Sequence, residues 1–296
     1  MIYLCKKIAI TTIIAGSFCL NISQAQVTDV IYPSPQSAND SRFNDLIDLL
    51  DKALQITTDK YGSYTLNPSA NIMGEGRYLE QIKSGKEVNI VYASTSSERE
   101  NDLLPIRIPL RKGLLGYRLF LIDKNKQSDF SQVSNLYTLK SFTLGQGHDW
   151  GDLQVYRPQS FSIETASQYE NLFKMLLKGR FDYFPRGVNE AWVEYDERID
   201  QMPNLSVEKD LMLFYPWPYY FFVNKNDAEL AKRVEEGLET MIDNGMFDEI
   251  FLKYHGQTIQ RADMSNRRLF KVENPILPVN TPSLDDERLW YKPNVQ

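Results

Sequence analysis

Apolar residues recur along the chain at two spacings, one typical of strands and the other of amphipathic helices. Short apolar runs rich in β-branched and aromatic residues predict strands at 27–32, 64–66, 88–93, 117–122, 141–144, 161–163, 181–184, 211–215 and 219–223. Apolar positions three and four residues apart predict helices at 41–54, 77–84, 149–155, 168–178, 227–245 and 246–254. The two kinds of element alternate over most of the chain, which is typical of an α/β protein.

The segment 172–187 gives the clearest local pattern. A helix with one apolar face is followed by Gly179, which can adopt the left-handed conformation that ends helices. A short apolar strand over 181–184 comes next, and Pro185 stops its hydrogen-bond ladder. Arg186 then stands at the carboxyl end of that strand, where open α/β sheets hold their ligands. We therefore take Arg186 as a candidate binding residue.

This order of helix, glycine, strand and polar residue resembles the second lobe of bacterial extracytoplasmic solute-binding proteins of the amino-acid-binding type (family 3). Ser96-Ser97-Glu98-Arg99 is similar to the family's "T-x-x-R" step, and 144–152 to its glycine-bearing turn into a helix. The stretch 211–256 is similar to its return segment. The resemblance covers roughly residues 40 to 256. It implies a divergent member with the two-lobed, type II periplasmic-binding-protein-like α/β fold. Each lobe would be a mixed sheet flanked by helices, and two crossover strands would form a hinge.

The resemblance also implies where a ligand would bind. Arg99 would clamp a carboxylate, since a guanidinium offers a planar fork that matches one. The other implied binding residues are Ser94, Ser96 and Tyr92 from the first lobe, and Gly147, His148, Asp149, Trp150 and Arg186 from the second. The family's usual aspartate for an ammonium group is replaced near Arg186, so two arginines facing one cleft favour an anionic ligand.

Several of these residues also have an ordinary structural interpretation. Arg186 could form a salt bridge with Glu190 or Asp182, and Arg99 could be a solvated loop charge. Tyr92 and Trp150 could be packing residues. Ser94 and Ser96 suit loop turns, and the pair His148 and Asp149 suits the start of a helix.

The expected division of the chain follows from two strand-like crossings, near Ile122 and Leu211. Lobe one would comprise 26–122 plus 211–296, and lobe two 123–210. The tail 257–296 extends beyond the usual ending of the family. We expect it to lie as a strap over lobe one, held by Leu269, Phe270, Ile276 and Trp290.

The first residues have the pattern of an export signal. Lys6 and Lys7 precede a short apolar run over 8–20, and Ser23-Gln24-Ala25 fits a small-x-small cleavage site. The run is too short for a comfortable membrane span. We expect cleavage after Ala25 and a periplasmic location. Both cysteines, Cys5 and Cys19, lie in this segment, so the mature chain would have no disulfide and no thiolate chemistry.

Composition excludes several functional classes. The net charge of −6, without a basic tract, makes the chain a poor nucleic-acid binder. The two histidines, His148 and His255, are far apart in sequence, which argues against a histidine-rich metal site. The motifs of a nucleophile elbow and a phosphate loop are missing, and Gly145-Gln146-Gly147 does not complete a dinucleotide fingerprint. We therefore assign no catalytic residue, metal or cofactor.

We expect a monomeric solute-binding protein that captures a small polar, carboxylate-bearing or anionic solute between two lobes by hinge closure, for uptake. A membrane permease or receptor, such as an ABC transporter, is a candidate partner. Two alternatives stay open. Some relatives with this fold are dehydratases, so a periplasmic enzyme on the same scaffold is the first, and a ligand-sensing module without a transporter is the second.

Overall fold

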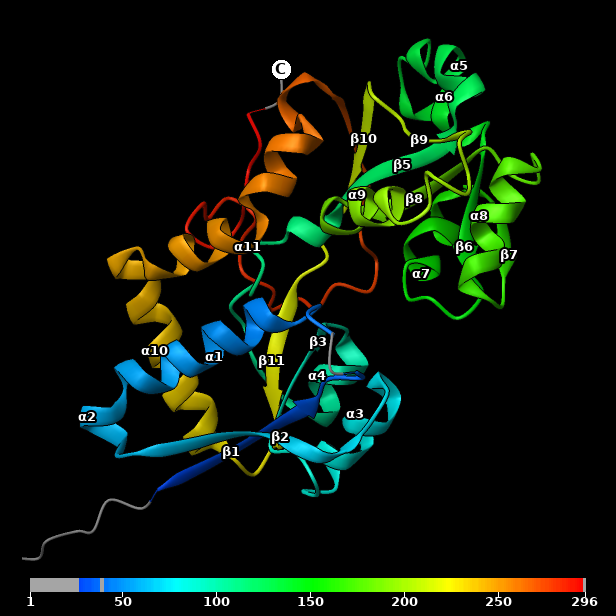
Figure 1. The fold of residues 1–296 in the computed structure, drawn as a ribbon. Coiled ribbons are helices and arrows are strands. Elements are labelled where there is room, and N and C mark those ends of the chain that lie inside the picture. Colours follow the sequence, from blue (N-terminus) through cyan, green and yellow to red (C-terminus); the bar gives the residue numbers. More distant parts are fainter. Residues whose placement is uncertain (1–26, 38–39, 295–296) are drawn as a thin grey trace, which may run out of the picture.

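The computed structural model describes residues 27–37 and 40–294, so the predicted export segment and its cleavage site lie outside the described residues. The chain forms two α/β bodies joined by extended segments (Figure 1). We call the body at the bottom of Figure 1 lobe one and the body at the upper right lobe two. In both, β-sheets are flanked by helices, which confirms the expected two-lobed α/β fold class.

Lobe one combines a parallel strand pair with a three-stranded antiparallel unit. The parallel pair is β1 (Thr28–Ser34) and β2 (Tyr64–Ile72). The antiparallel unit has β11 (Tyr219–Val223) between β3 (Ile90–Ser94) and β4 (Leu104–Ile106). Asn89 joins the two, because its backbone N–H donates to the Ile31 carbonyl at 3.0 Å and its Oδ1 accepts from the Ile31 N–H at 2.7 Å.

Helices cover both faces of lobe one. On one face, α1 (Asn44–Ile56) and α10 (Ala228–Asn244) bury their apolar stripes against β1, β3 and β11. On the other face, α3 (Glu75–Lys83) buries Tyr78 and Ile82 against β3 and β11. The two short helices of this lobe are α2 (Thr58–Tyr61) and α4 (Ser97–Asp102).

Lobe two is built on a larger sheet with the order β12-β10-β5-β8-β6-β7, and β9 also pairs with β5. The strands are β5 (Tyr117–Asp123), β6 (Thr143–Gly147), β7 (Ser162–Ala166), β8 (Tyr183–Gly187), β9 (Leu205–Val207), β10 (Leu211–Phe214) and β12 (Arg268–Lys271). The helices are α5 (Gln127–Ser131), α6 (Leu136–Lys140), α7 (Leu153–Tyr156), α8 (Tyr169–Leu177) and α9 (Val188–Asp196). Apolar clusters lie on both faces of this sheet.

The strand pairing bears on the expected lobe boundaries. Strands β5 and β10, which we used as crossings, pair with each other and with the lobe-two strands β8 and β12. The short segments that pass directly from one sheet to the other are instead 107–116 and 215–218, and a third, helical passage runs from β11 through α10 and α11 (Met246–Ala262) to β12. We therefore propose the two short segments as the linkers of the hinge.

The last helix is longer than its sequence pattern predicts. The pattern predicts a helix over 246–254 with Gly256 as its stop, but α11 continues for six residues beyond that glycine. A glycine inside a helix costs only about 1 kcal/mol relative to alanine. Packing outweighs that cost, because Ala262 is buried in the core of lobe two and the partly buried Ile259 packs against it. In Figure 1, α11 accordingly runs from α10 toward β10.

The tail also differs from the expected strap over lobe one alone. Leu269 and Phe270 lie in β12, which pairs in parallel with β10 at the edge of the lobe-two sheet. Ile276 packs against the same lobe, while Trp290 lies against the first linker at Gly113. The tail therefore contacts lobe two and the linkers as well as lobe one.

Candidate functional site

A cavity of about 530 Å³ lies between the lobes. Its lobe-one side comes from the segment 41–43 just before α1, from Arg111 and Leu115 in the first linker, and from Tyr219 at the start of β11. Its lobe-two side comes from Tyr169, Arg186 and one face of α9. That face carries Asn189, Glu190, Val193 and Glu194, with Glu197 just beyond the end of the helix.

Arg111 is a buried cation on the lobe-one side of this cavity. Its Nε and Nη2 donate to the two carboxylate oxygens of Asp45 at 2.6 and 2.8 Å, and Nη2 also donates to the Arg42 carbonyl at 2.7 Å. Its guanidinium lies over the rings of Phe43 and Tyr219, 5.6 and 5.8 Å from their centroids. Three kinds of contact thus fix the orientation of this side chain.

Asp45 is held in turn by a second partner. The Nε2 of His255, on α11, lies 3.0 Å from Asp45 Oδ2, and both residues are buried. Burial alone would raise the pKa of the Asp45 carboxyl. The charge and hydrogen bonds of Arg111, together with the contact to His255, outweigh burial and keep that pKa below its usual range.

Arg186 mirrors Arg111 on the lobe-two side. Its Nε donates to both carboxylate oxygens of Glu194 at 2.8 Å, and its Nη2 donates to Glu194 Oε1 at 2.7 Å. Nη2 also lies 3.3 Å from Glu190 Oε2. The guanidinium stacks over Trp150 at 4.7 Å, which rigidifies it further.

Both arginines leave the same atom unused. In each, the edge formed by Nε and Nη2 binds a carboxylate, while Nη1 makes no hydrogen bond with the described residues. The two residues are 7% and 8% exposed, and both line the cavity. The cavity is therefore lined by two oriented guanidiniums, each with N–H groups available to a bound molecule.

The acidic residues of α9 differ in electrostatic environment. For Glu190, burial opposes ionisation, but the charges of Arg186 and Arg118 and the Gly187 N–H, at 2.9 Å, lower its pKa overall. For Glu194, burial prevails and the pKa is raised, although Arg186 opposes the shift. Two carboxylates share one guanidinium here, so the deeper one is less readily ionised.

Asn189 adds a polar atom without a partner. Its Oδ1 is buried and accepts no hydrogen bond from the described residues. A buried carbonyl oxygen in this state costs free energy on the order of 1–3 kcal/mol. Asn189 lines the cavity, so a change of its side-chain rotamer would bring this oxygen to a donor of a bound molecule.

Arg99, the carboxylate clamp expected from the sequence, does not line this cavity. Its guanidinium binds the Ser94 carbonyl and lies 3.2 Å from Glu75 Oε1. It lines a separate groove of about 190 Å³ beside α3 and α4, together with Lys83 and Asp102. The ligand role of Arg99 stays a prediction.

The other lobe-one candidates lie around Arg99 or behind the cavity. Ser96 caps α4 by accepting the Arg99 backbone N–H at 3.2 Å, and the Ser94 hydroxyl lies 3.2 Å from Arg99 Nη1. Tyr92 is buried, and its ring contacts Phe43 with 4.5 Å between centroids. Tyr92 therefore supports a cavity residue without lining the cavity.

The lobe-two candidates are split between the surface and the cavity wall. The side chains of His148 and Asp149 are 55% and 72% exposed, and they lie in a turn before α7. A side chain at Gly147 would collide with Trp150. Trp150 packs on the guanidinium of Arg186, which is the lobe-two candidate that lines the cavity.

Sequence reasoning missed Arg111, Asn189 and Glu194 as cavity residues. A sequence signal for Glu194 was available. It lies eight residues after Arg186, about two turns into α9, the helix that follows the strand. Arg111 lies in a turn between strands, where Lys112 and Gly113 both have positive φ. Sequence spacing does not reveal which way a side chain in such a turn points.

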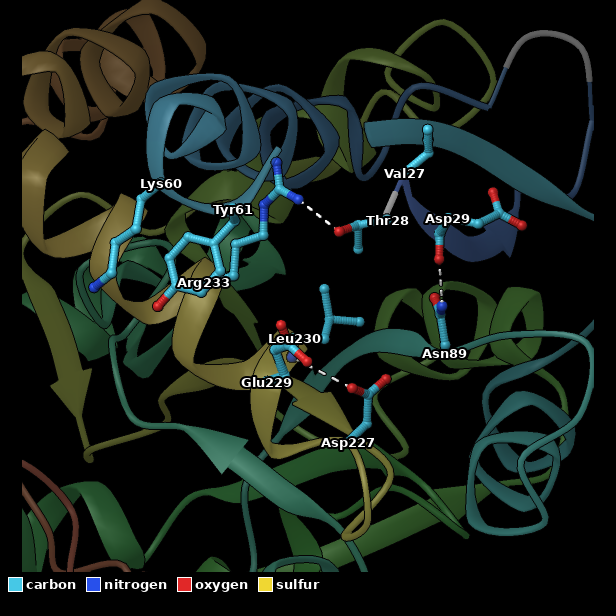
Figure 2. Close-up of a pocket in the computed structure, with 10 residues that line it drawn as sticks. All are labelled: Val27, Thr28, Asp29, Lys60, Tyr61, Asn89, Asp227, Glu229, Leu230 and Arg233. Atoms are coloured by element: carbon cyan, nitrogen blue, oxygen red, sulfur yellow. Dashed lines mark hydrogen bonds between the residues drawn. The ribbon is translucent and has the colours of Figure 1, made fainter. Parts of the chain in front are cut away.

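A second cavity, of about 460 Å³, lies in lobe one at the start of β1 (Figure 2). Arg233 is its most buried residue, and its guanidinium points at Thr28, donating to the hydroxyl at 2.6 Å. It also donates to the Gly62 carbonyl at 2.8 Å. These contacts tie α10 to β1 and α2, so Arg233 has a structural role.

Among the described residues there is neither a bilayer-spanning helix nor a metal-binding cluster. Over the described residues, each helix is too short or too polar to cross a bilayer. The same residues contain no grouping of three or more His, Cys, Asp or Glu side chains placed to hold a metal ion.

No protein-family model and no curated protein matches the sequence. Solved structures do match the fold. The probable amino-acid ABC transporter extracellular-binding protein ytmK from Bacillus subtilis matches with a TM-score of 0.58 and 17% identity, over 78% of this chain and 99% of the other. A structure described for glutathione import via GshT and the cystine ABC importer TcyBC of Streptococcus mutans gives 0.54 and 14%, over 78% and 96%.

An ancestral arginine-binding protein bound to glutamine has a TM-score of 0.53 and 16% identity, with 78% of this chain and 99% of the other covered. Identities this low establish shared architecture, and the sheet order and interlobe cavity described above agree with it. The chain therefore has the two-lobed fold of the type II periplasmic binding proteins.

Proposed function

We propose that this protein binds a small polar solute bearing a carboxylate, or another small anion, in the cavity between its lobes. The observation that carries the proposal is the pair Arg111 and Arg186, one on each side of the cavity, each with Nη1 unused by the described residues. Their other edges are already neutralised by Asp45 and Glu194, so the guanidiniums are oriented before a ligand arrives. Pre-oriented donors lose little conformational entropy on binding.

The remaining cavity atoms suit a solute with a donor as well as a carboxylate. After a change of its side-chain rotamer, Asn189 would present Oδ1 to an ammonium or hydroxyl group as a hydrogen-bond acceptor. The apolar parts of Phe43, Leu115 and Val193 would cover the rest of a small molecule. Approach of the lobes about the linkers 107–116 and 215–218 would remove the bound solute from water and strengthen these contacts.

The place of action belongs to the same proposal. We propose that the chain is exported and works outside the cytoplasm, delivering its solute to a membrane permease or receptor for uptake. Support comes from the fold, because the similar B. subtilis structure is a probable ABC transporter extracellular-binding protein. The N-terminal pattern of Lys6, Lys7 and the apolar run over 8–20 supports export.

A thermal-unfolding screen of amino acids, dicarboxylates and inorganic anions tests the proposal. A ligand at one hundred times its dissociation constant adds about 2.7 kcal/mol to the free energy of unfolding. For each compound that stabilises the protein, we expect Arg111→Lys and Arg186→Lys to raise the dissociation constant about tenfold or more, measured by calorimetry. Lysine keeps the charge opposite Asp45 and Glu194 but cannot offer the second edge of the guanidinium.

Arg99→Lys is the matched control, because Arg99 lies outside the cavity in its own groove. We expect it to leave the dissociation constant within twofold of the wild-type value. The opposite pattern, in which only Arg99→Lys weakens binding, would move the site to that groove. Failure of every carboxylate and anion to stabilise the protein would contradict the proposed ligand class.

A further inference from the structure

The C-terminal region after α10 connects the two lobes a second time, beyond the two linkers. The first half of α11 packs on lobe one, where Phe247 is buried with α1 and α10. Other side chains of the same helix pack on lobe two, where Phe251 and, at the end of the helix, Ala262 are buried. Figure 1 shows the chain passing from α11 into the region of β10 and α9.

The passage from α11 to β12 is firmly held. Arg267 is buried and donates to three backbone carbonyls, those of Ala262, Glu208 and Leu211, at 2.6, 2.5 and 3.1 Å. On the surface, Arg261 of α11 pairs with Asp196 at the end of α9. The end of α11 is therefore fixed to lobe two.

The segment after β12 then returns along both linkers. Asn274 Nδ2 donates to the carbonyl of Pro216, in the second linker, at 2.8 Å. The Tyr291 N–H donates to the carbonyl of Lys112, in the first linker, also at 2.8 Å. Between these points, Leu289 packs against the core of lobe one.

Trp290 makes the closest contact of this segment with the hinge. It is buried, and its ring lies where a Cβ on Gly113 would stand, 2.3 Å from that position. Gly113 has φ of +68°, a conformation that L side chains rarely adopt. Any other residue at position 113 would therefore force a change in the backbone of the first linker or in the position of the Trp290 ring.

We propose that residues 263–294 form a strap across the hinge that limits how far the two lobes can rotate relative to each other. Rotation of the lobes changes the distance between β12, which pairs with β10 in lobe two, and Leu289, which packs on lobe one, and the strap joins these two points across the linkers. Any large opening must therefore break the Asn274 contact, the Tyr291 contact or the packing of Trp290. This inference concerns the hinge alone and needs no ligand, so it stands or falls independently of the proposed function.

Distance distributions between two spin labels test the strap directly. With Cys5→Ser and Cys19→Ser as background, labels at Gln55→Cys on α1 and Lys178→Cys after α8 report on the interlobe separation, because both positions are exposed. We expect a narrow distribution for this background protein. In Asn274→Ala/Trp290→Ala, which removes one contact to each linker, we expect the distribution to become at least twice as wide.

Val279→Ala/Leu284→Ala is the matched control, since both residues lie on the same segment and are exposed. It should leave the width unchanged. A protease site inserted between Ser283 and Leu284 provides a second route, because the strap is then cut after the protein has folded. Cleavage should widen the distribution as the double variant does.

Two results would overturn the inference. The first is an unchanged distribution in a double variant that keeps its far-ultraviolet circular dichroism. The second is an unchanged distribution after complete cleavage. Either would mean that the segment stabilises the lobes without restricting their motion.

Discussion

At the scale of single residues, His255, Asp45 and Arg111 form a buried set of charged and polar side chains. It joins α11, α1 and the first linker through a pair of hydrogen bonds at 2.6 and 2.8 Å and a contact at 3.0 Å. Breaking a buried ion pair by removing one partner costs about 3–5 kcal/mol, because the other charge is left unpaired. This set therefore affects both the stability of lobe one and the orientation of Arg111.

The pH dependence of stability follows from the lowered pKa of Asp45. A carboxyl group with a folded-state pKa below its unfolded value stabilises the protein above the unfolded value, near 4, and this contribution is lost as the pH falls further. We expect Asp45→Asn to lower the free energy of unfolding by about 3 kcal/mol at pH 7, and by progressively less below pH 4. Denaturant titrations between pH 7 and pH 3 measure the difference.

Asp200→Asn serves as the control for that experiment, because Asp200 is exposed in the turn after α9. It should change the free energy of unfolding by less than about 0.5 kcal/mol at each pH. A constant difference between Asp45→Asn and the wild type from pH 7 to pH 3 would contradict the assignment of the ion pair.

How far the site could be predicted depends on where each residue sits. Arg186 could be predicted from the sequence, because it follows a clear apolar strand and so lies at the carboxyl end of that strand. The salt bridge with Glu190, its ordinary structural interpretation, is also present. Arg111 was not accessible, because its direction depends on two successive left-handed residues in a turn. The Asp45–Arg111 contact joins residues 66 positions apart, and local patterning carries no information about such pairs.

At the scale of elements, the close contact between α1 and α10 explains why position 237 is a glycine. Gly237 of α10 faces α1, and a Cβ at this position would lie 2.3 Å from the Ala53 carbonyl oxygen. The two helices can approach this closely only without a side chain at 237. We expect Gly237→Ala to destabilise the protein by about 2 kcal/mol, because backbone atoms must move to relieve the overlap. Chemical denaturation measures the change.

Gly256→Ala offers the matched comparison within the neighbouring helix α11. A Cβ there would meet its nearest atom, Leu252 Cβ, at 4.0 Å, which is ordinary contact. Because alanine is the better helix former, this variant should gain up to about 1 kcal/mol. A Gly237→Ala variant that is as stable as the wild type or as Gly256→Ala would contradict the described packing of α1 on α10.

The elements themselves were largely predictable, and their limits were not. The amphipathic pattern predicted α10 well, since its apolar stripe, Asp227 cap and terminal Gly245 agree with one another. It failed for the end of α11 because Gly256 is a weak stop when the following turn packs on another lobe. The extension of β2 to Ile72 was missed because the strand contains Pro68 and exposed polar residues.

At the scale of the whole molecule, the lobes are joined by the two linkers, the α11–β12 passage and the returning strap. We therefore expect the two lobes to unfold cooperatively, since unfolding one lobe would expose the side chains of α11 that pack on it. We expect a single calorimetric transition whose calorimetric and van't Hoff enthalpies agree. Two resolved transitions would instead show that the lobes unfold independently.

The division into lobes could be predicted only in outline. That lobe one is discontinuous follows from the resemblance of 211–256 to a return segment. The assignment of β5 and β10 to lobe two depends on their pairing with β8 and β12, which the apolar character of the strands does not specify. The sequence patterns of a hinge strand and of a central sheet strand are the same.

The central position of β11 in lobe one has a consequence for how the polypeptide acquires its shape. Phe221 pairs with Tyr92, which precedes it by 129 positions, so the sheet cannot be completed until almost three quarters of the sequence has been synthesised. Lobe two, by contrast, joins β5, β6, β7, β8 and β9 within one contiguous stretch. Closing long loops is entropically slow. During synthesis or translocation, the amino-terminal third would therefore wait, incompletely paired and open to aggregation or chaperone capture, until its late partner strand arrives.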